Sequence, residues 1–199
     1  MKTLIVSLVM LMSLCVEPLT PRGFAQQDAA VQMQDVLVAL NALRTNPASF
    51  VPKLRAYRDI VAKRTKNVAA LDAAIAEATE RLSKEKSLSA LNMQGALLLA
   101  AQDHAADISK NNVVGHTGSD KSTPSQRVKK YAPLASVAEV ITYGYTTADM
   151  IIASFIVDQD TPNRGHREIV LSEKYTMVGI AIAKHKTYTT ACVMVLGGV

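Results

Sequence analysis

The chain has 199 residues, of which 49% are apolar and 20% are charged, and its formal net charge is +5. This composition is close to that of ordinary globular proteins and excludes a disordered or fibrous chain. Two cysteines, no tryptophan, six tyrosines and three phenylalanines exclude three further classes. These are a disulfide-stapled miniprotein, a four-cysteine zinc ribbon and an aromatic surface that stacks on bases.

The first 25 residues have the pattern of an export signal. Lys2 is followed by an apolar run over residues 3–16, and the small residues Gly23 and Ala25 come shortly afterwards. The run is too short for a stable membrane span and resembles the core of a signal peptide. We expect cleavage after Ala25 and a secreted or periplasmic protein, with no transmembrane segment after the signal. Lipidation at Cys15, which the bulky Leu14 disfavours, and a retained N-terminal anchor are the alternatives.

Residues 26–199 are long enough for one domain with a substantial core. Only Cys192 remains after the predicted cleavage, so no disulfide can form within the domain. Cys192 lies in the strand-like run 189–195, where we expect it to be a small buried hydrophobe.

Helical patterns dominate the first two thirds of this domain. Apolar spacing predicts a helix over 31–43 that ends at Asn46-Pro47, with Pro47 in the first turn of the next helix. An Ala-rich, charged pattern predicts an exposed helical excursion at about 66–88. Asn92 is the expected cap of a central helix over 93–110.

Strand patterns come mostly later. Thr123-Pro124-Ser125-Gln126 is a capping box that predicts a short helix, and a strand is expected over 136–143. Thr147 should cap a helix to about residue 157, and a short helix should begin near His166. Runs at 175–184 and 187–196 predict a hairpin around His185. This order favours an α+β fold in which helices cover a mainly antiparallel sheet.

Glu139 needs a partner, because both faces of its predicted strand are apolar, and an unpaired carboxylate buried on either face would be costly. His116 and His166 are the candidates, and each directly follows a glycine that leaves the ring accessible. In the first turn of its helix, His166 would favour the neutral form that metals bind. Asp158 and Asp160 add carboxylates just before it. We expect His104 to be structural and His185 to be exposed.

Positive charge is concentrated between Arg44 and Lys66, where seven basic residues face Asp59 alone. The stretch is either a solvated helix face or a contact for an anionic partner such as lipid headgroups or an envelope polymer. It lacks interleaved aromatic residues and a reading motif, so nucleic acid is not expected as a partner. The chain also lacks the common hydrolase, phosphate-loop and dinucleotide motifs.

An ordered set of short motifs resembles the CAP superfamily, or SCP domain, which includes cysteine-rich secretory proteins, antigen 5 and pathogenesis-related 1 proteins. The resemblance runs from about Val36 to Leu196. The matching elements are Leu40 to Arg44 with Asn46-Pro47, Leu97 to Ala100, His104 to Asp107, Gly115 to Asp120, Ala138 to Ile141, Ala148 to Phe155, Arg164 to Arg167, Tyr175, and Val178 to Ile180.

The resemblance implies an α-β-α sandwich with a cleft tetrad of His116, Glu139, Asp158 and His166, in which the histidines can bind zinc or another divalent metal. Three positions depart from the family pattern. Val140 replaces the usual Asn after the first acid, Phe155 replaces a Trp, and Asp158 replaces a Glu. Since Asp is one methylene shorter, Asp158 could act through water, with Asp160 as its substitute and Arg164 as an accessory residue. Few cysteines indicate the bacterial type.

Members of the superfamily are proposed to bind sterols, fatty acids or other apolar ligands. We therefore expect a secreted, non-catalytic binding module whose cleft takes a divalent metal and whose partner is an apolar or anionic envelope ligand. One alternative is a metal-dependent, peptidase-like hydrolase with Glu139 as general base. Another is a cleft tetrad that serves only as a structural polar network.

Overall fold

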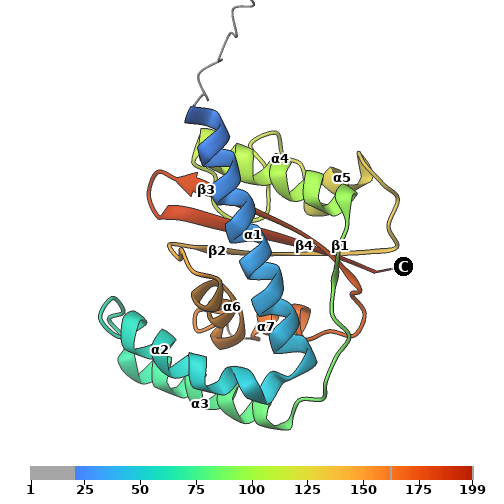
Figure 1. Ribbon diagram of the computed structural model, residues 1–199. Helices are drawn as coiled ribbons and strands as arrows, with labels where there is room; N and C mark the ends of the chain where they lie inside the picture. Colours follow the sequence, from blue (N-terminus) through green and yellow to red (C-terminus); the bar gives the residue numbers. More distant parts are fainter. Residues whose placement is uncertain (1–20, 162, 199) are drawn as a thin grey trace, which may run out of the picture.

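The computed structural model describes residues 21–161 and 163–198, with side chains from Met33 onward (Figure 1). Residues 1–20 of the predicted leader 1–25 lie outside this range, so the roles of Lys2 and Cys15 stay predictions. The helices are α1 (Pro21–Thr45), η1 (Pro47–Phe50, a 3-10 helix), α2 (Val51–Val61), α3 (Val68–Lys84), α4 (Gly95–Asn111), α5 (Pro124–Lys129), α6 (Ala148–Val157) and α7 (Gly165–Val170). The strands are β1 (Asn92–Met93), β2 (Ser136–Tyr143), β3 (Met177–His185) and β4 (Thr189–Gly198).

The four strands form one mixed sheet in the order β1-β3-β4-β2. The β3–β4 hairpin and the β2–β4 pair are antiparallel, and the short β1 pairs with β3 in parallel. This arrangement confirms the expected α+β fold with a mainly antiparallel sheet. Strand β2 forms one edge of the sheet and the short β1 lies at the other, so side chains from both faces of the sheet can meet beside β2.

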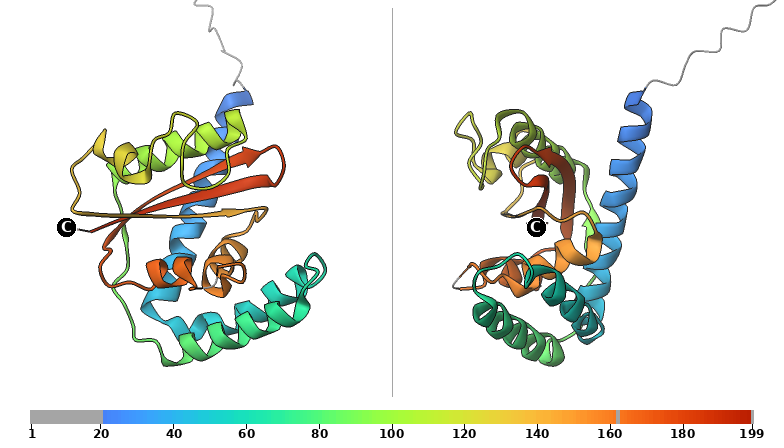
Figure 2. Two further views of the ribbon diagram at one scale, coloured as in Figure 1. Left: turned by 180° about the vertical axis from the view of Figure 1, so that it is seen from behind. Right: turned by 90° about the vertical axis from the view of Figure 1, so that its left-hand side faces the viewer.

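Helices cover both faces of the sheet (Figures 1 and 2). On one face, α4 packs through Leu97, Ala101 and Ile108 against a cluster that includes Ile141 and Val193. The other face packs on α1, α6 and α7, and α2 and α3 form an outer layer beyond them. A Cβ at Gly179 would lie only 2.1 Å from the backbone of Leu97, so glycine is needed for α4 to sit on β3.

Arg44, at the end of α1, does not belong to a basic surface as the sequence pattern predicted. Arg44 is only 1% exposed and donates hydrogen bonds to the backbone carbonyls of Ser89, Val170, Ser172 and Tyr175. It therefore ties the helix end to two distant loops and is not part of a cationic surface. Burial lowers its pKa, and the carbonyls supply the acceptors that a buried guanidinium requires.

The helix expected at about 66–88 is present, but the expectation that it is exposed is wrong. Helix α3 begins at a side-chain cap from Asn67 and buries Leu71, Ala74, Ala78 and Leu82. These residues belong to the main core together with residues of α2 and α6. The sequence pattern did not indicate this buried face, because only two of its four side chains are large and the other two are alanines.

Three local predictions differ from the structure. Asn92 lies in β1 beside Met177, and Gln94 caps α4 by accepting from Leu97 N. His185 is buried at 3% exposure rather than exposed, because its Nδ1 accepts from the turn amides of Thr187 and Tyr188. Helix α1 begins at Pro21, ten residues before the expected start.

Within the described ranges, no helix combines the length and apolar character needed to cross a bilayer.

Candidate functional site

Glu139 lies on the face of β2 that is covered by α4 and α5. Its side chain is 1% exposed, and both carboxylate oxygens are engaged. Oε1 is 2.9 Å from His116 Nδ1, and Oε2 accepts from Arg127 Nη2 at 2.8 Å. The acid therefore has the partners that its burial requires.

His116 is held by the loop that follows α4. Gly115 before it has a φ of +88°, a backbone conformation that side chains strongly disfavour. The Gly115 N–H donates to the Tyr143 hydroxyl, and its carbonyl accepts from His104 Nε2. The loop is thus fixed from a helix and from a strand, and it presents His116 with 47% of its side chain exposed.

His166 forms a second pair with Asp158 on the other side of the sheet. Its Nδ1 lies 2.8 Å from Asp158 Oδ1, and its backbone N–H donates to Oδ2 of the same carboxylate at 2.9 Å. Burial raises the pKa of Asp158, but the hydrogen bonds from His166 and Thr161 outweigh this effect, and the net pKa is lowered. Asp158 therefore remains a carboxylate that orients the ring.

The two histidine–carboxylate pairs meet beside the edge strand β2, with ring centroids 6.4 Å apart. His116 comes from the α4 side, and His166 comes from the α6–α7 side. Because Glu139 faces the α4 side, it pairs with His116 and not with His166. The structure thus brings the four predicted tetrad residues together as two separate pairs.

Both pairs fix the same tautomer. A carboxylate accepts only, so in the neutral form each ring donates from Nδ1 and keeps the lone pair on Nε2. Among the described residues, neither Nε2 atom has a hydrogen-bond partner. A carboxylate on the far nitrogen is the usual support for a metal-binding histidine. The donor set therefore fits a divalent metal held by His116 and His166, with the carboxylates behind them.

The accessory residues lie in different places. Asp160 is exposed and lines a cavity together with His166. Arg164 is the residue before α7, and it donates to the carbonyls of Asp158, Gln159 and Thr161 while pairing with Glu77. Arg164 therefore shapes the loop rather than facing a ligand. The described residues contain no group of three or more His, Cys, Asp or Glu side chains arranged to hold a metal.

Sequence reasoning did not identify Arg127 and His104 as neighbours of Glu139. Arg127 is 2% exposed and also donates to the carbonyls of His116 and Ser122. His104 is fully buried, and burial lowers its pKa, so it is neutral, with Nε2 3.9 Å from Glu139 Oε1. His104 is the one polar residue on the buried stripe of α4, and that position was the available signal.

Comparisons with known proteins agree with this architecture. The sequence model of the CAP family, described as the cysteine-rich secretory protein family, matches residues 37–196. No curated protein matches the chain. An extracellular SCP-domain protein from Bacillus anthracis is 17% identical with a TM-score of 0.55, and the alignment covers 92% of this chain and 45% of the other. At this identity, the likeness supports the fold alone.

Two further structures align less closely. An outer surface protein from Borrelia burgdorferi is 19% identical with a TM-score of 0.48, over 67% of this chain and 96% of the other. A cysteine-rich secretory protein from Staphylococcus aureus is 16% identical with a TM-score of 0.43, over 68% and 40%. The chain thus spans less than half of the Bacillus and Staphylococcus chains. Since the family match extends over residues 37–196, the chain belongs to the CAP family.

Proposed function

We propose that the protein is an exported binding module that holds a divalent metal between His116 and His166 and contacts an anionic polymer of the cell envelope. The observation that carries the metal assignment is the paired geometry described above. Each imidazole is oriented by a buried carboxylate, and the two rings lie 6.4 Å apart with Nε2 free. Two protein ligands leave room for water or for a ligand group on the metal.

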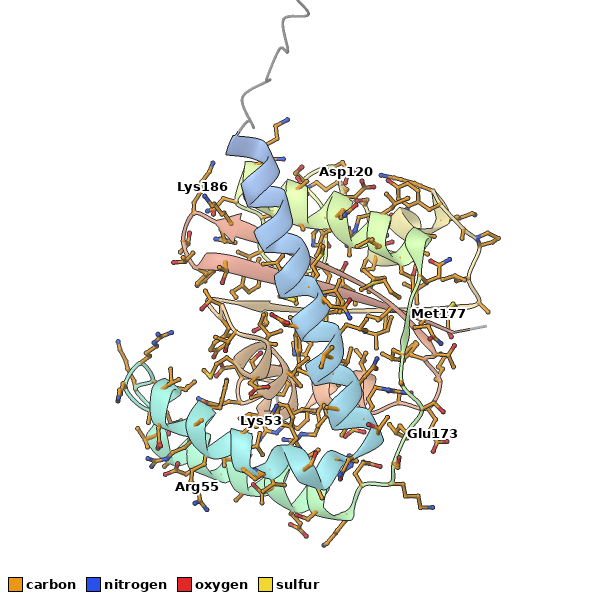
Figure 3. All side chains as sticks on the ribbon, in the orientation of Figure 1. Lys53, Arg55, Asp120, Glu173, Met177 and Lys186 are labelled. Atoms are coloured by element: carbon orange, nitrogen blue, oxygen red, sulfur yellow. The ribbon has the colours of Figure 1, made fainter. Side chains whose placement is uncertain are left out.

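Exposed cations between α2 and α3 support the polymer contact. Several residues of the basic stretch are already engaged, because Lys53 pairs with Asp149 and Arg58 pairs with Asp72. Lys63, Arg64 and Lys66, here called the basic tip, are more than one third exposed and form no ion pair among the described residues. Arg55 of α2, labelled in Figure 3, is a further exposed cation of the layer that α2 and α3 form. A repeating polyanion would neutralise such a cluster.

The same geometry argues against the hydrolase alternative. A general base must reach the proton that it removes, but both oxygens of Glu139 are engaged and its side chain is 1% exposed. Glu139 instead orients His116.

Calorimetric titration of the purified protein with Zn²⁺ tests the metal site. We expect saturable binding to the native protein and at least a tenfold loss of affinity in His116→Ala/His166→Ala. The matched control is His185→Gln, which changes a buried imidazole of the β3–β4 hairpin outside the proposed ligand pair. Equal Zn²⁺ affinity in the native protein and the double variant would remove the metal assignment.

Charge reversal tests the basic tip. Lys63→Glu/Lys66→Glu should weaken binding to polygalacturonate at least tenfold. Lys129→Glu/Lys186→Glu changes the net charge equally at exposed positions on α5 and the β3–β4 turn, and it should bind like the native protein. Equal losses in both variants would mean that net charge alone drives the interaction. Loss of binding to anionic vesicles without loss of polymer binding would identify a lipid partner instead.

Export is tested separately from binding. Intact-mass analysis of protein recovered outside the cytoplasm should show a chain that begins at Gln26. A lipid-modified chain that begins at Cys15, or an uncleaved chain in the membrane fraction, would identify one of the two alternatives.

A further inference from the structure

The outer edge of β2 carries backbone groups that point away from the sheet. Strand β2 is the last in the order β1-β3-β4-β2, so it pairs on one side only (Figure 1). Gly144 N donates to Thr190 O, and with the observed register this means that the even-numbered residues of β2 exchange hydrogen bonds with β4. The N–H and C=O groups of Ile141 and Tyr143 therefore face outward.

These outward groups have no other partner among the described residues. The Tyr143 hydroxyl accepts from Gly115 N, but the backbone groups of Ile141 and Tyr143 form no hydrogen bond with a loop, a helix or a side chain. Both residues line a cavity of about 550 Å³ that runs beside this edge and also includes His166. Its volume is in the range of cavities that bind small ligands. An unpaired sheet edge is a template on which an extended chain can add as a strand.

Apolar side chains line the cavity from both faces of the sheet. Val114 follows α4, and Tyr188 contacts Tyr143 on the face that α4 covers. Val61 of α2 and Phe155 of α6 come from the opposite face. The side chains of an added strand alternate between the two faces. Both sides of such a strand would therefore meet apolar walls.

The sheet edge distinguishes a peptide from a lipid. A fatty acid or a sterol fits apolar walls, but it cannot pair with a row of amide N–H and C=O groups. Covering these groups without replacing their hydrogen bonds to water is costly. A peptide main chain offers an acceptor for each N–H and a donor for each C=O. The backbone of β2 therefore favours a peptide with apolar side chains.

The charges in the cavity complement a peptide with free ends. Asp158 is engaged by His166, which leaves Asp160 and Arg64 as charged lining residues with no ion-pair partner in the part of the chain that the structure describes. An ammonium group suits the carboxylate, and a carboxylate suits the guanidinium. We propose that a short peptide with free ends and apolar side chains adds to β2 beside Ile141 and Tyr143. This inference goes beyond the proposed function and depends on neither the metal nor the polymer.

Calorimetry with the free pentapeptide Ala-Val-Tyr-Val-Leu in EDTA tests the proposal. We expect saturable binding. In a paired strand, alternate N–H groups face the partner strand. Methylating the nitrogen of the second or of the third peptide residue should therefore cost at least tenfold in affinity for one of the two peptides and less than about threefold for the other. Equal losses, or no loss in either peptide, would mean that the peptide main chain does not pair with β2.

Hydrogen exchange followed by NMR locates the peptide without any substitution. The amides of Ile141 and Tyr143 should exchange at least tenfold more slowly when the peptide is saturating. Val140 and Thr142 already face β4, so their amides are the internal reference and should change much less. Uniform slowing of the four amides, or no slowing, would overturn the assignment to the edge of β2.

Neutralising the two charges tests the peptide ends. Asp160→Asn and Arg64→Gln should each weaken binding of the free peptide by about threefold, and neither should affect a peptide with acetylated and amidated ends. Glu173→Gln and Lys63→Gln are the matched controls, because both residues are exposed and lie outside the cavity. Equal losses for free and capped peptides would contradict the role of the ends.

The outcomes separate this inference from the metal and polymer assignments. No saturable binding of the pentapeptide, together with intact Zn²⁺ and polygalacturonate binding, overturns the peptide proposal alone. Stoichiometric uptake of a fatty acid without peptide binding also overturns it. Peptide binding in EDTA that shows the alternating effect of methylation supports it, whatever the protein's affinity for Zn²⁺.

Discussion

Arg127 and Glu139 form a buried ion pair beneath His116, with Nη2 and Oε2 2.8 Å apart and side-chain exposures of 3% and 1%. The pair joins α5 to the edge strand, and Arg127 also donates to the His116 carbonyl. The exposed histidine therefore depends on a charge pair that water does not reach. Its geometry is fixed before any ligand arrives.

Removing the cation from this pair should destabilise the fold strongly. Arg127→Met leaves a buried carboxylate without its charge partner, and we expect a loss of about 3–5 kcal/mol in the free energy of unfolding. Urea denaturation of the native protein and the variant measures this difference. Lys130→Met, an exposed change at the end of the same helix, should cost less than about 1 kcal/mol.

The double variant Arg127→Met/Glu139→Leu is the internal control. It removes both charges, so it should be more stable than Arg127→Met alone. A double variant that is less stable by the sum of the single losses would mean that the two side chains act independently.

Replacing Arg44 should also destabilise the fold, but through lost hydrogen bonds rather than a lost ion pair, because its partners are all backbone carbonyls. Arg44→Met keeps the apolar stem but leaves the carbonyls of Ser89, Val170, Ser172 and Tyr175 without this donor. We expect a loss of about 3 kcal/mol in the free energy of unfolding. Thermal and urea unfolding should agree, and Arg55→Met on the exposed side of α2 is the matched control. Equal stability of the two variants would contradict this role.

Local sequence signals were enough to predict most elements. Pro47 ends α1, and the capping box at Thr123 and Gln126 begins α5, as the sequence indicates. Both signals act within a few residues, so no tertiary information is needed. The strand at 136–143 and the hairpin after it follow from residue type and alternation in the same way.

Partner choice could not be predicted from such local signals. Arg44 lies in a basic stretch whose composition predicts an exposed surface. It is buried because it donates to the carbonyls of Val170 and Tyr175, which are distant in the sequence. The pairing of Glu139 with Arg127 depends on which face of β2 meets α5. His116 and His166 come from opposite sides of the sheet, and the sequence does not show this. It could therefore indicate the four tetrad residues but not which carboxylate pairs with which histidine.

Asp107 should make the folded state less stable at low pH. Burial raises its pKa, but hydrogen bonds from the Ser119 hydroxyl and amide and from Asn111 outweigh this and lower the pKa to about 2 from an ordinary value of 3.8. A lowered folded pKa means that the stabilisation is complete above about pH 4 and is lost as the pH falls toward 2.

The variant Asp107→Asn isolates this contribution. It should be less stable than the native protein by about 1 kcal/mol at pH 7, a value reduced for the solvent screening of a partly exposed group. The difference should shrink between about pH 4 and pH 2. Urea midpoints of both proteins across this range measure it, and a difference that stays constant with pH would assign the effect to shape rather than charge.

Cys192 offers a probe of global unfolding. It lies on β4 at 2% exposure, and burial raises the pKa of its thiol to about 12. Because the thiolate is the reactive form, the native protein should react negligibly with a disulfide reagent at pH 8. The rate should rise only with urea, in step with the loss of secondary structure. Rapid labelling of the folded protein at pH 8 would mean that the β2–β4 edge opens without global unfolding.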